Sequence, residues 1–173
     1  DDYRAKIKVE DEVRKMETEF KYKRGADQWA GSVVFRHALF ASKDGLVREL
    51  QEFDPTILHF ACHGEESALK LFGSDLGRLN LKKLVASWSD AGDKCLRLII
   101  ANACNSWEIV QDLARNVDFV IGHQTPVKDD IAIAFSGHLY RALGSGEHLM
   151  RSFTMAKLVT SDRYCMGGRR NAE

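Results

Sequence analysis

The run LRLIIA at Leu96–Ala101 gives the strongest buried-strand pattern in the chain, and Asn-Ala-Cys-Asn-Ser follows it directly at 102–106. Short apolar runs bounded by polar residues are typical of strands that are buried on both faces of a parallel sheet. The run TILHFA at Thr56–Ala61 has the same character, and Gly64 ends it. These two runs predict neighbouring parallel strands and decide the fold class.

Helical and strand patterns alternate along the chain on either side of these two runs. Val9, Val13, Met16 and Phe20, for example, recur at the spacing of one buried helical stripe. The alternation predicts an α/β fold, a three-layer sandwich whose mostly parallel sheet carries helices on both faces. The predicted helices are 8–20, 42–52, 80–88, 106–115, 129–143 and 147–159, and the predicted strands are 32–41, 56–61, 68–72, 96–101 and 117–121.

Composition narrows the class of protein further. The chain has 173 residues, with 25 Lys and Arg against 25 Asp and Glu, so its formal net charge is zero. That balance argues against a basic nucleic-acid binder. No apolar run reaches the roughly 18 residues of a membrane span, and the N-terminus lacks the apolar core of a secretory signal. The four cysteines show no disulfide framework, which favours reduced thiols in a cytoplasmic protein.

The domain organisation is predicted to be simple. A length of 173 residues suits one domain over 1–173. The chain does not begin with Met, so we expect it to be a piece of a longer multidomain protein. The tail from Thr160 is expected to be frayed.

Two predicted strand ends carry residues with catalytic chemistry. His63 follows the first run and Cys104 follows the second. The carboxyl ends of neighbouring parallel strands lie on one rim of a sheet, which suits a Cys–His nucleophile pair. Asn105 and Glu108 have the spacing of a capping box, which predicts a helix N-terminus that favours the thiolate of Cys104.

Backbone amides near Cys104 could assist the proposed Cys–His pair, and each of the two residues also has a purely structural interpretation. Gly64 permits close approach of its backbone, and the amides of Gly64 and Cys104 could donate to an oxyanion. The alternative for Cys104 is a small core residue, and for His63 a ring satisfied by the backbone. A zinc site from His59, Cys62, His63 and Cys104 is disfavoured, because His59 and His63 lie on a strand and Cys-x-x-Cys is absent. No cofactor or metal is predicted.

Five ordered blocks between about 41 and 156 resemble the CHAT domain, the caspase-like peptidase domain that is related to separase and the caspases. The blocks are PTILHFACHG at 55–64, LIIANACNS at 98–106, VDFVIG at 117–122, VKDDIAIAF at 127–135 and YRAL at 140–143. The resemblance implies a caspase-hemoglobinase fold and cysteine endopeptidase chemistry without a third acid. The family's histidine falls on His63 and its cysteine on Cys104.

The same resemblance implies a substrate pocket and a setting. Asp129 matches an acidic family position and, with Asp130, is expected to bind a basic residue before the cut; a helix N-cap is the alternative. The family's first strand is missing, so we expect regulatory domains or subunits of the parent protein. A protein or peptide substrate and a role in bacterial defence or cell death are further expectations. The alternative is a catalytically silent scaffold or protein-interaction module.

Overall fold

The structure is a computed structural model, and it describes residues 3–22, 34–39, 41–65, 67–89, 95–160 and 164–168. The contacts between residues divide the chain into two compact units. The helical unit comprises Asp1–Leu39 and Lys128–Asp162, and the sheet unit comprises Phe40–Val127 and Arg163–Glu173.

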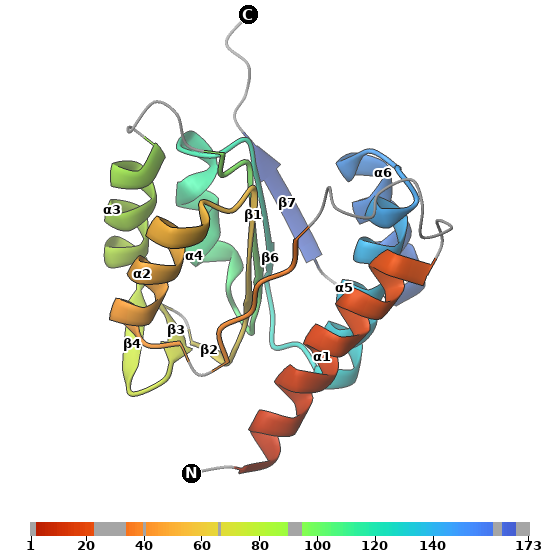
Figure 1. The fold of residues 1–173 in the computed structure, drawn as a ribbon, viewed down its shortest axis with the longest axis horizontal. Helices are drawn as coiled ribbons and strands as arrows, with labels where there is room; N and C mark the ends of the chain where they lie inside the picture. The colour runs from red at the N-terminus through yellow and green to blue at the C-terminus, as the bar shows by residue number, and fades with distance from the viewer. Residues whose placement is uncertain are drawn as a thin grey trace, which may run out of the picture. The chain divides into compact units, whose positions relative to one another are not determined.

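The helical unit contains α1 (Tyr3–Tyr22), α5 (Asp129–Gly144) and α6 (Leu149–Thr160), and α5 packs against both other helices (Figure 1). A Cβ added to Gly144 would lie 2.4 Å from the carbonyl oxygen of Phe20, so glycine permits this close helix contact. Inside the unit, the hydroxyl of Ser136 donates a 2.6 Å hydrogen bond to the buried carboxylate of Glu12. Apolar packing and paired polar groups together hold these helices.

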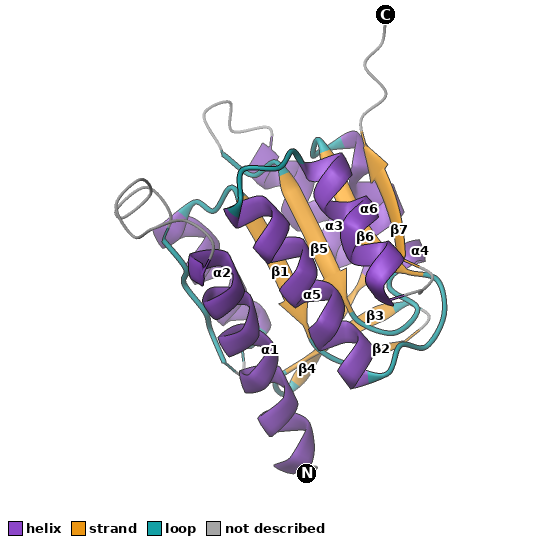
Figure 2. Ribbon diagram, turned by 90° about the vertical axis from the view of Figure 1, so that its right-hand side faces the viewer, coloured by secondary structure: helices purple, strands orange, loops and turns teal. Residues whose placement is uncertain are grey.

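Within the described residues, the larger sheet of the sheet unit has the strand order β1-β5-β6-β7, which Figure 2 shows side by side. β1 (Ile57–Ala61), β5 (Leu98–Asn102) and β6 (Phe119–His123) are parallel, and β7 (Tyr164–Gly168) runs antiparallel to β6. A separate antiparallel sheet contains three short strands, β2 (Gly64–Glu65), β3 (Ala68–Leu71) and β4 (Ser74–Gly77).

Three helices lie on one face of the larger sheet (Figure 1): α2 (Lys43–Phe53), α3 (Arg78–Ser89) and α4 (Trp107–Gln111), which continues into the 3-10 turn η1 (Asp112–Arg115). Alternate strand residues point toward these helices and form the core with them. The buried members include Phe60, Ile99, Ala101 and Val120 from the strands and Leu46, Leu50, Leu81, Val85, Ile109, Val110 and Leu113 from the helices and η1.

The predicted α/β class with a mostly parallel sheet is confirmed. The two deciding runs form β1 and β5. Helix α2 begins after Ser42, whose hydroxyl accepts from the Gly45 amide at 3.1 Å, as the predicted cap requires. It ends at Asp54, whose backbone is left-handed with φ 46°.

Other predictions need correction. The predicted strand at 32–41 is absent over its described residues, 34–39 and 41, and Phe35 packs its ring against Phe20 and Tyr140 instead of pairing in a sheet. Residues 32, 33 and 40 lie outside the described residues. The tail is not frayed at Tyr164–Gly168, because pairing with β6 makes it a strand. Helix α3 begins two residues before the predicted cap Asn80.

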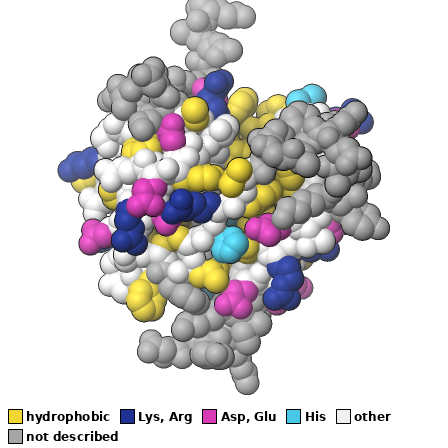
Figure 3. All heavy atoms as spheres, in the orientation of Figure 1, with side chains coloured by type: hydrophobic (Ala, Val, Ile, Leu, Met, Phe, Trp, Pro, Cys, Tyr) yellow, Lys and Arg dark blue, Asp and Glu magenta, His cyan; other side chains and the backbone are white. Residues whose placement is uncertain are grey.

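The surface carries charges of both signs. Lys and Arg side chains alternate with Asp and Glu side chains on the face that Figure 3 shows, in keeping with the zero net charge. Among the described residues, no helix is both long enough and apolar enough to cross a membrane.

Candidate active site

The β1–β5 pairing brings His63 and Cys104 to the same rim of the sheet. Ala61 is the register partner of Asn102, and His63 and Cys104 each lie two residues beyond this pair. A Cβ added to Gly64 would be only 2.1 Å from the carbonyl oxygen of Cys104. The backbone after His63 therefore lies directly against the backbone of Cys104, and the absence of a side chain at Gly64 makes this approach possible.

His63 is held from its backbone side by the small sheet. Its carbonyl accepts a 2.9 Å hydrogen bond from the amide of Lys70 on β3, while the residue is exposed. The Lys70 ammonium donates to Asp75 at 2.7 Å and lies 3.0 Å from Glu65, and these hydrogen bonds raise the pKa of Lys70. The strands around His63 are thus tied together while the imidazole stays accessible to solvent.

The thiol of Cys104 is partly buried and contacts the backbone of Val127. The Val127 amide donates to Sγ at 3.3 Å, and Sγ lies 3.6 Å from the Val127 carbonyl oxygen, to which the thiol can donate. The following residue, Asn105, has a left-handed backbone with φ 51°, a conformation that Asn tolerates better than most residues. The chain therefore turns sharply after Cys104 and presents its sulfur at the loop.

The predicted capping box does not form. The N-cap of α4 is Ser106, which makes no side-chain cap hydrogen bond, and α4 has five residues. The left-handed turn at Asn105 places this residue outside the cap geometry. Cys104 lies three residues before the first residue of α4, so the sulfur's backbone donor comes from Val127 rather than from a helix N-terminus.

Among the described residues, the ring of His63 makes no hydrogen bond to the thiol of Cys104. In cysteine and serine hydrolases, such bonds often tighten only when substrate is bound, so this arrangement is compatible with a dyad at rest. The described part of the chain assembles no group of three or more His, Cys, Asp or Glu side chains as a metal centre would.

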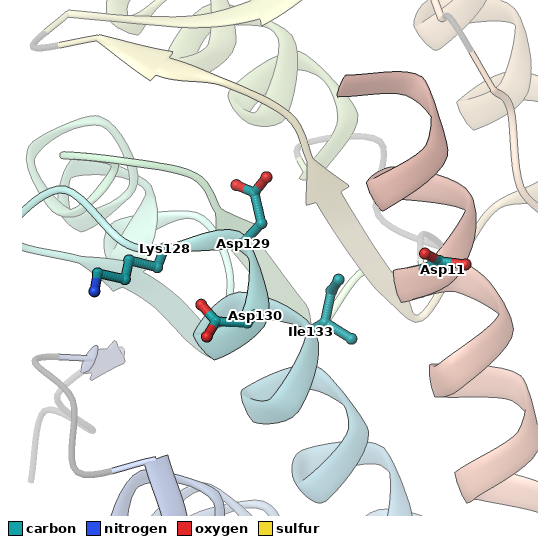
Figure 4. Close-up of a pocket in the computed structure, with 5 residues that line it drawn as sticks. All are labelled: Asp11, Lys128, Asp129, Asp130 and Ile133. Atoms are coloured by element: carbon teal, nitrogen blue, oxygen red, sulfur yellow. The ribbon is translucent and has the colours of Figure 1, made fainter. Parts of the chain in front are cut away.

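Asp129 and Asp130 lie in the first turn of α5, in the helical unit. The N-cap is Lys128, so the alternative interpretation of Asp129 as N-cap is wrong. With Asp11, Lys128 and Ile133 the two aspartates line a shallow hollow, where their carboxylates point in different directions (Figure 4). Carboxylates in the first turn interact favourably with the helix dipole.

Sequence reasoning missed a buried polar cluster next to Cys104. His123, at the end of β6, is fully buried, and its ring packs edge-on against Tyr164 with centroids 4.7 Å apart. The Tyr164 hydroxyl donates to Asn102, at the end of β5. The available signal was the position of His123 directly after an apolar run, the same pattern that singled out His63.

These features, parallel strands with cysteine and histidine at neighbouring carboxyl ends, are those of a caspase-like cysteine protease fold. The structure is similar to that of a secreted C11 cysteine protease from Bacteroides thetaiotaomicron, solved in complex with an irreversible peptide inhibitor. The TM-score is 0.58 at 15% sequence identity, and the match covers 90% of this chain and 55% of that protease. The chain thus spans about half the length of that protease.

A comparison of the sequence with family models identifies the family. The CHAT domain model matches residues 13–164, and the chain belongs to the CHAT domain family. A search of the curated proteins finds no match.

Proposed function

We propose that the chain is a cysteine endopeptidase in which Cys104 is the nucleophile and His63 the general acid and base. The observation that carries the proposal is the close approach of Gly64 to the carbonyl oxygen of Cys104, beyond the carboxyl ends of the paired strands β1 and β5. The family match and the protease-like fold support the same reaction class.

The proposed reaction has two stages. His63 takes the proton of the Cys104 thiol, Sγ attacks the carbonyl carbon of the scissile peptide, and the C–N bond breaks as His63 gives that proton to the leaving amine. His63 then takes a proton from water, and the water oxygen attacks the carbonyl carbon of the thioester. The C–S bond breaks, the acid is released, and His63 returns the proton to the sulfur. The amides of Gly64 and Cys104 are the proposed donors to the oxyanion of each tetrahedral intermediate.

We also propose that Asp129 and Asp130 bind a basic side chain of the substrate. The support is the hollow that they line with Asp11, Lys128 and Ile133 in the helical unit, where three carboxylates lie with one ammonium group. A basic side chain is the complementary partner for such carboxylates. The substrate would then be a protein or peptide that is cut after lysine or arginine.

The proposed setting is a cytoplasmic effector of a bacterial defence or cell-death system, controlled by regulatory domains or subunits of the parent protein. The likeness to caspase-like proteases supports a regulated peptidase. Its cleavage would be expected only in the presence of the activating partner.

The test is cleavage of a diverse peptide library by the parent protein, read by mass spectrometry. Cys104→Ala should abolish the cuts, and His63→Ala should slow them by about 10²- to 10⁴-fold, the usual contribution of a general acid–base. Cys95→Ala is the matched control, because Cys95 is exposed, and it should cleave like the wild type. Cuts that persist in Cys104→Ala would refute the proposal, and a folded, activated protein without cuts would favour the scaffold.

A further inference from the structure

The last residue of β6 and the four residues that follow it, 123–127, contact the loop that carries Cys104; we call this segment the cysteine strap. Three hydrogen bonds join it to the consecutive loop residues Cys104, Asn105 and Ser106. The Val127 amide donates to Sγ of Cys104 at 3.3 Å, the Asn105 amide donates to the Thr125 carbonyl at 3.3 Å, and the His123 amide donates to the Ser106 hydroxyl at 3.0 Å. The Ser106 hydroxyl in turn donates a 2.7 Å hydrogen bond to the carbonyl oxygen of Ala101 on β5.

The buried ring of His123 fixes the middle of the strap. Nδ1 lies 2.5 Å from the carbonyl oxygen of Thr125 and 3.2 Å from the Thr125 amide. A ring nitrogen donates in one tautomer and accepts in the other, so Nδ1 bonds to the Thr125 backbone in either state. Pro126 follows and favours an extended backbone at Thr125. The ring therefore determines where the next amide, that of Val127, points.

The ring of His123 is in turn fixed by β7. It packs against Tyr164, whose hydroxyl donates to Asn102, and β7 pairs with β6 through the register His123–Tyr164. His123, Tyr164 and Asn102 are buried, and they lie in the paired strands β6, β7 and β5 respectively. The ring of His123 is thus held by a buried neighbour and by the pairing of its own strand.

We propose that His123 is a positioning residue for Cys104, acting through the Thr125 backbone to keep the Val127 amide aimed at Sγ. The inference deepens the proposed function, and it rests on that function for its consequence in peptide cleavage. The hydrogen bonds of the Cys104 sulfur go to Val127 and not to His123. Its role is to keep one backbone donor in place.

The physical consequence is a change in the reactivity of Cys104. The thiolate is the reacting form of cysteine, and an N–H directed at sulfur stabilises that charged form. Without the His123 ring bond, the strap can move and the N–H···S contact is lost for much of the time. We expect alkylation of Cys104 to slow by about tenfold, the effect of losing one hydrogen bond to a charged group.

The experiment measures the rate at which iodoacetamide alkylates Cys104 in the folded protein, resolved from the other cysteines by peptide mass spectrometry. His123→Leu removes Nδ1 at similar size, and His123→Asn keeps a hydrogen-bonding atom near the Nδ1 position. Val120→Ala, three residues earlier on the same strand, is the control for destabilisation alone, because Val120 is fully buried in the hydrophobic core. Exposed Cys95 gives the reference rate in every sample.

The proposal predicts slow alkylation in His123→Leu, a rate within about twofold of wild type in His123→Asn, and a wild-type rate in Val120→Ala. If His123→Leu does not fold, His123→Phe takes its place, since it keeps the ring packing on Tyr164. A wild-type rate in the leucine or phenylalanine variant overturns the proposal. So does a slow rate that simply follows the loss of stability in all variants, Val120→Ala included.

This readout separates the inference from the proposed function, because alkylation needs no substrate. If the protein cleaves no peptide but its alkylation rate depends on His123, the positioning role of His123 stands and the proposed peptidase activity does not. If the protein cleaves peptides but Cys104 is alkylated at one rate in all variants, the peptidase activity stands and the positioning role does not. In an active protein, His123→Leu should lower kcat more than it raises KM, and His123→Asn should restore kcat.

Discussion

Replacing Gly64 by alanine tests the contact on which the site is built. The new Cβ would lie 2.1 Å from the Cys104 carbonyl oxygen, whereas ordinary contact begins at 3.4 Å, so the two backbones must separate by about 1.3 Å. Overpacking of this kind costs about 1–3 kcal/mol of stability. A displacement of about 1 Å at a reacting centre can lower activity about a hundredfold. We therefore expect a folded protein that is less stable by about 1–3 kcal/mol and cleaves about a hundredfold more slowly.

Thermal unfolding and peptide cleavage measure the two effects. For a chain of this size, each kcal/mol lowers Tm by about 2–4 °C. Gly77→Ala is the matched control, because its Cβ meets no atom closer than 3.9 Å and Gly77 lies in the neighbouring small sheet; it should leave both quantities near wild type. If Gly64→Ala has wild-type stability and cleavage, the close approach of the two strand ends does not exist as described.

Two further predictions concern the turn after the cysteine and the helical unit. Asn105→Val should lower the free energy of unfolding by about 1–2 kcal/mol, because a β-branched residue is strained at φ 51°, while Asn105→Gly should change it little. Denaturant unfolding measures the difference, and equal stability of the two variants would contradict the prediction. Burial opposes the ionisation of Glu19, but hydrogen bonds from Lys15 and Arg141 outweigh it and hold the pKa of Glu19 below its ordinary 4.5. A lowered pKa stabilises the fold above the unfolded pKa and loses that effect as pH falls through the folded value. Glu19→Gln should therefore lower the free energy of unfolding by only about 1 kcal/mol at pH 7, since Lys15 and Arg141 are half exposed. In thermal unfolding, the difference between variant and wild type should vanish in acid. A difference that grows in acid would refute the assignment.

The parallel strands β1 and β5 could be predicted because each is a short run of apolar residues that is recognisable from its own sequence. The apolar runs that form β1 and β5 need no knowledge of their neighbours, and their parallel pairing followed from alternation with helices. The proximity of His63 and Cys104 then followed from the rule that parallel strands share one carboxyl rim.

Strand β7 could not be predicted from its own residues. Tyr164–Gly168 reads YCMGG, which has no alternating pattern and ends in two glycines. It is a strand because β6 offers it a hydrogen-bonding edge and because Tyr164 finds His123 and Asn102 as buried neighbours. Tertiary context, not propensity, decides such a segment.

The failed capping box has a related cause. Asn105 and Glu108 have the spacing of a capping box, but spacing alone does not fix the backbone conformation that the N-cap residue needs. The contact of Asn105 with Thr125 comes from a segment twenty residues away in sequence, and the backbone at Asn105 turns left-handed. The donor to the Cys104 sulfur was missed for the same reason, since Val127 is distant in sequence.

The most direct test of the central claim is covalent trapping of the nucleophile. The protein is incubated with a peptide chloromethyl ketone that carries arginine next to the reactive group, and the modified residue is located by mass spectrometry. The account predicts a thioether on Cys104, formed as chloride leaves, with labelling strongly reduced in His63→Ala. Labelling spread over Cys62, Cys95 and Cys165, or a rate at Cys104 that does not depend on His63, would contradict it.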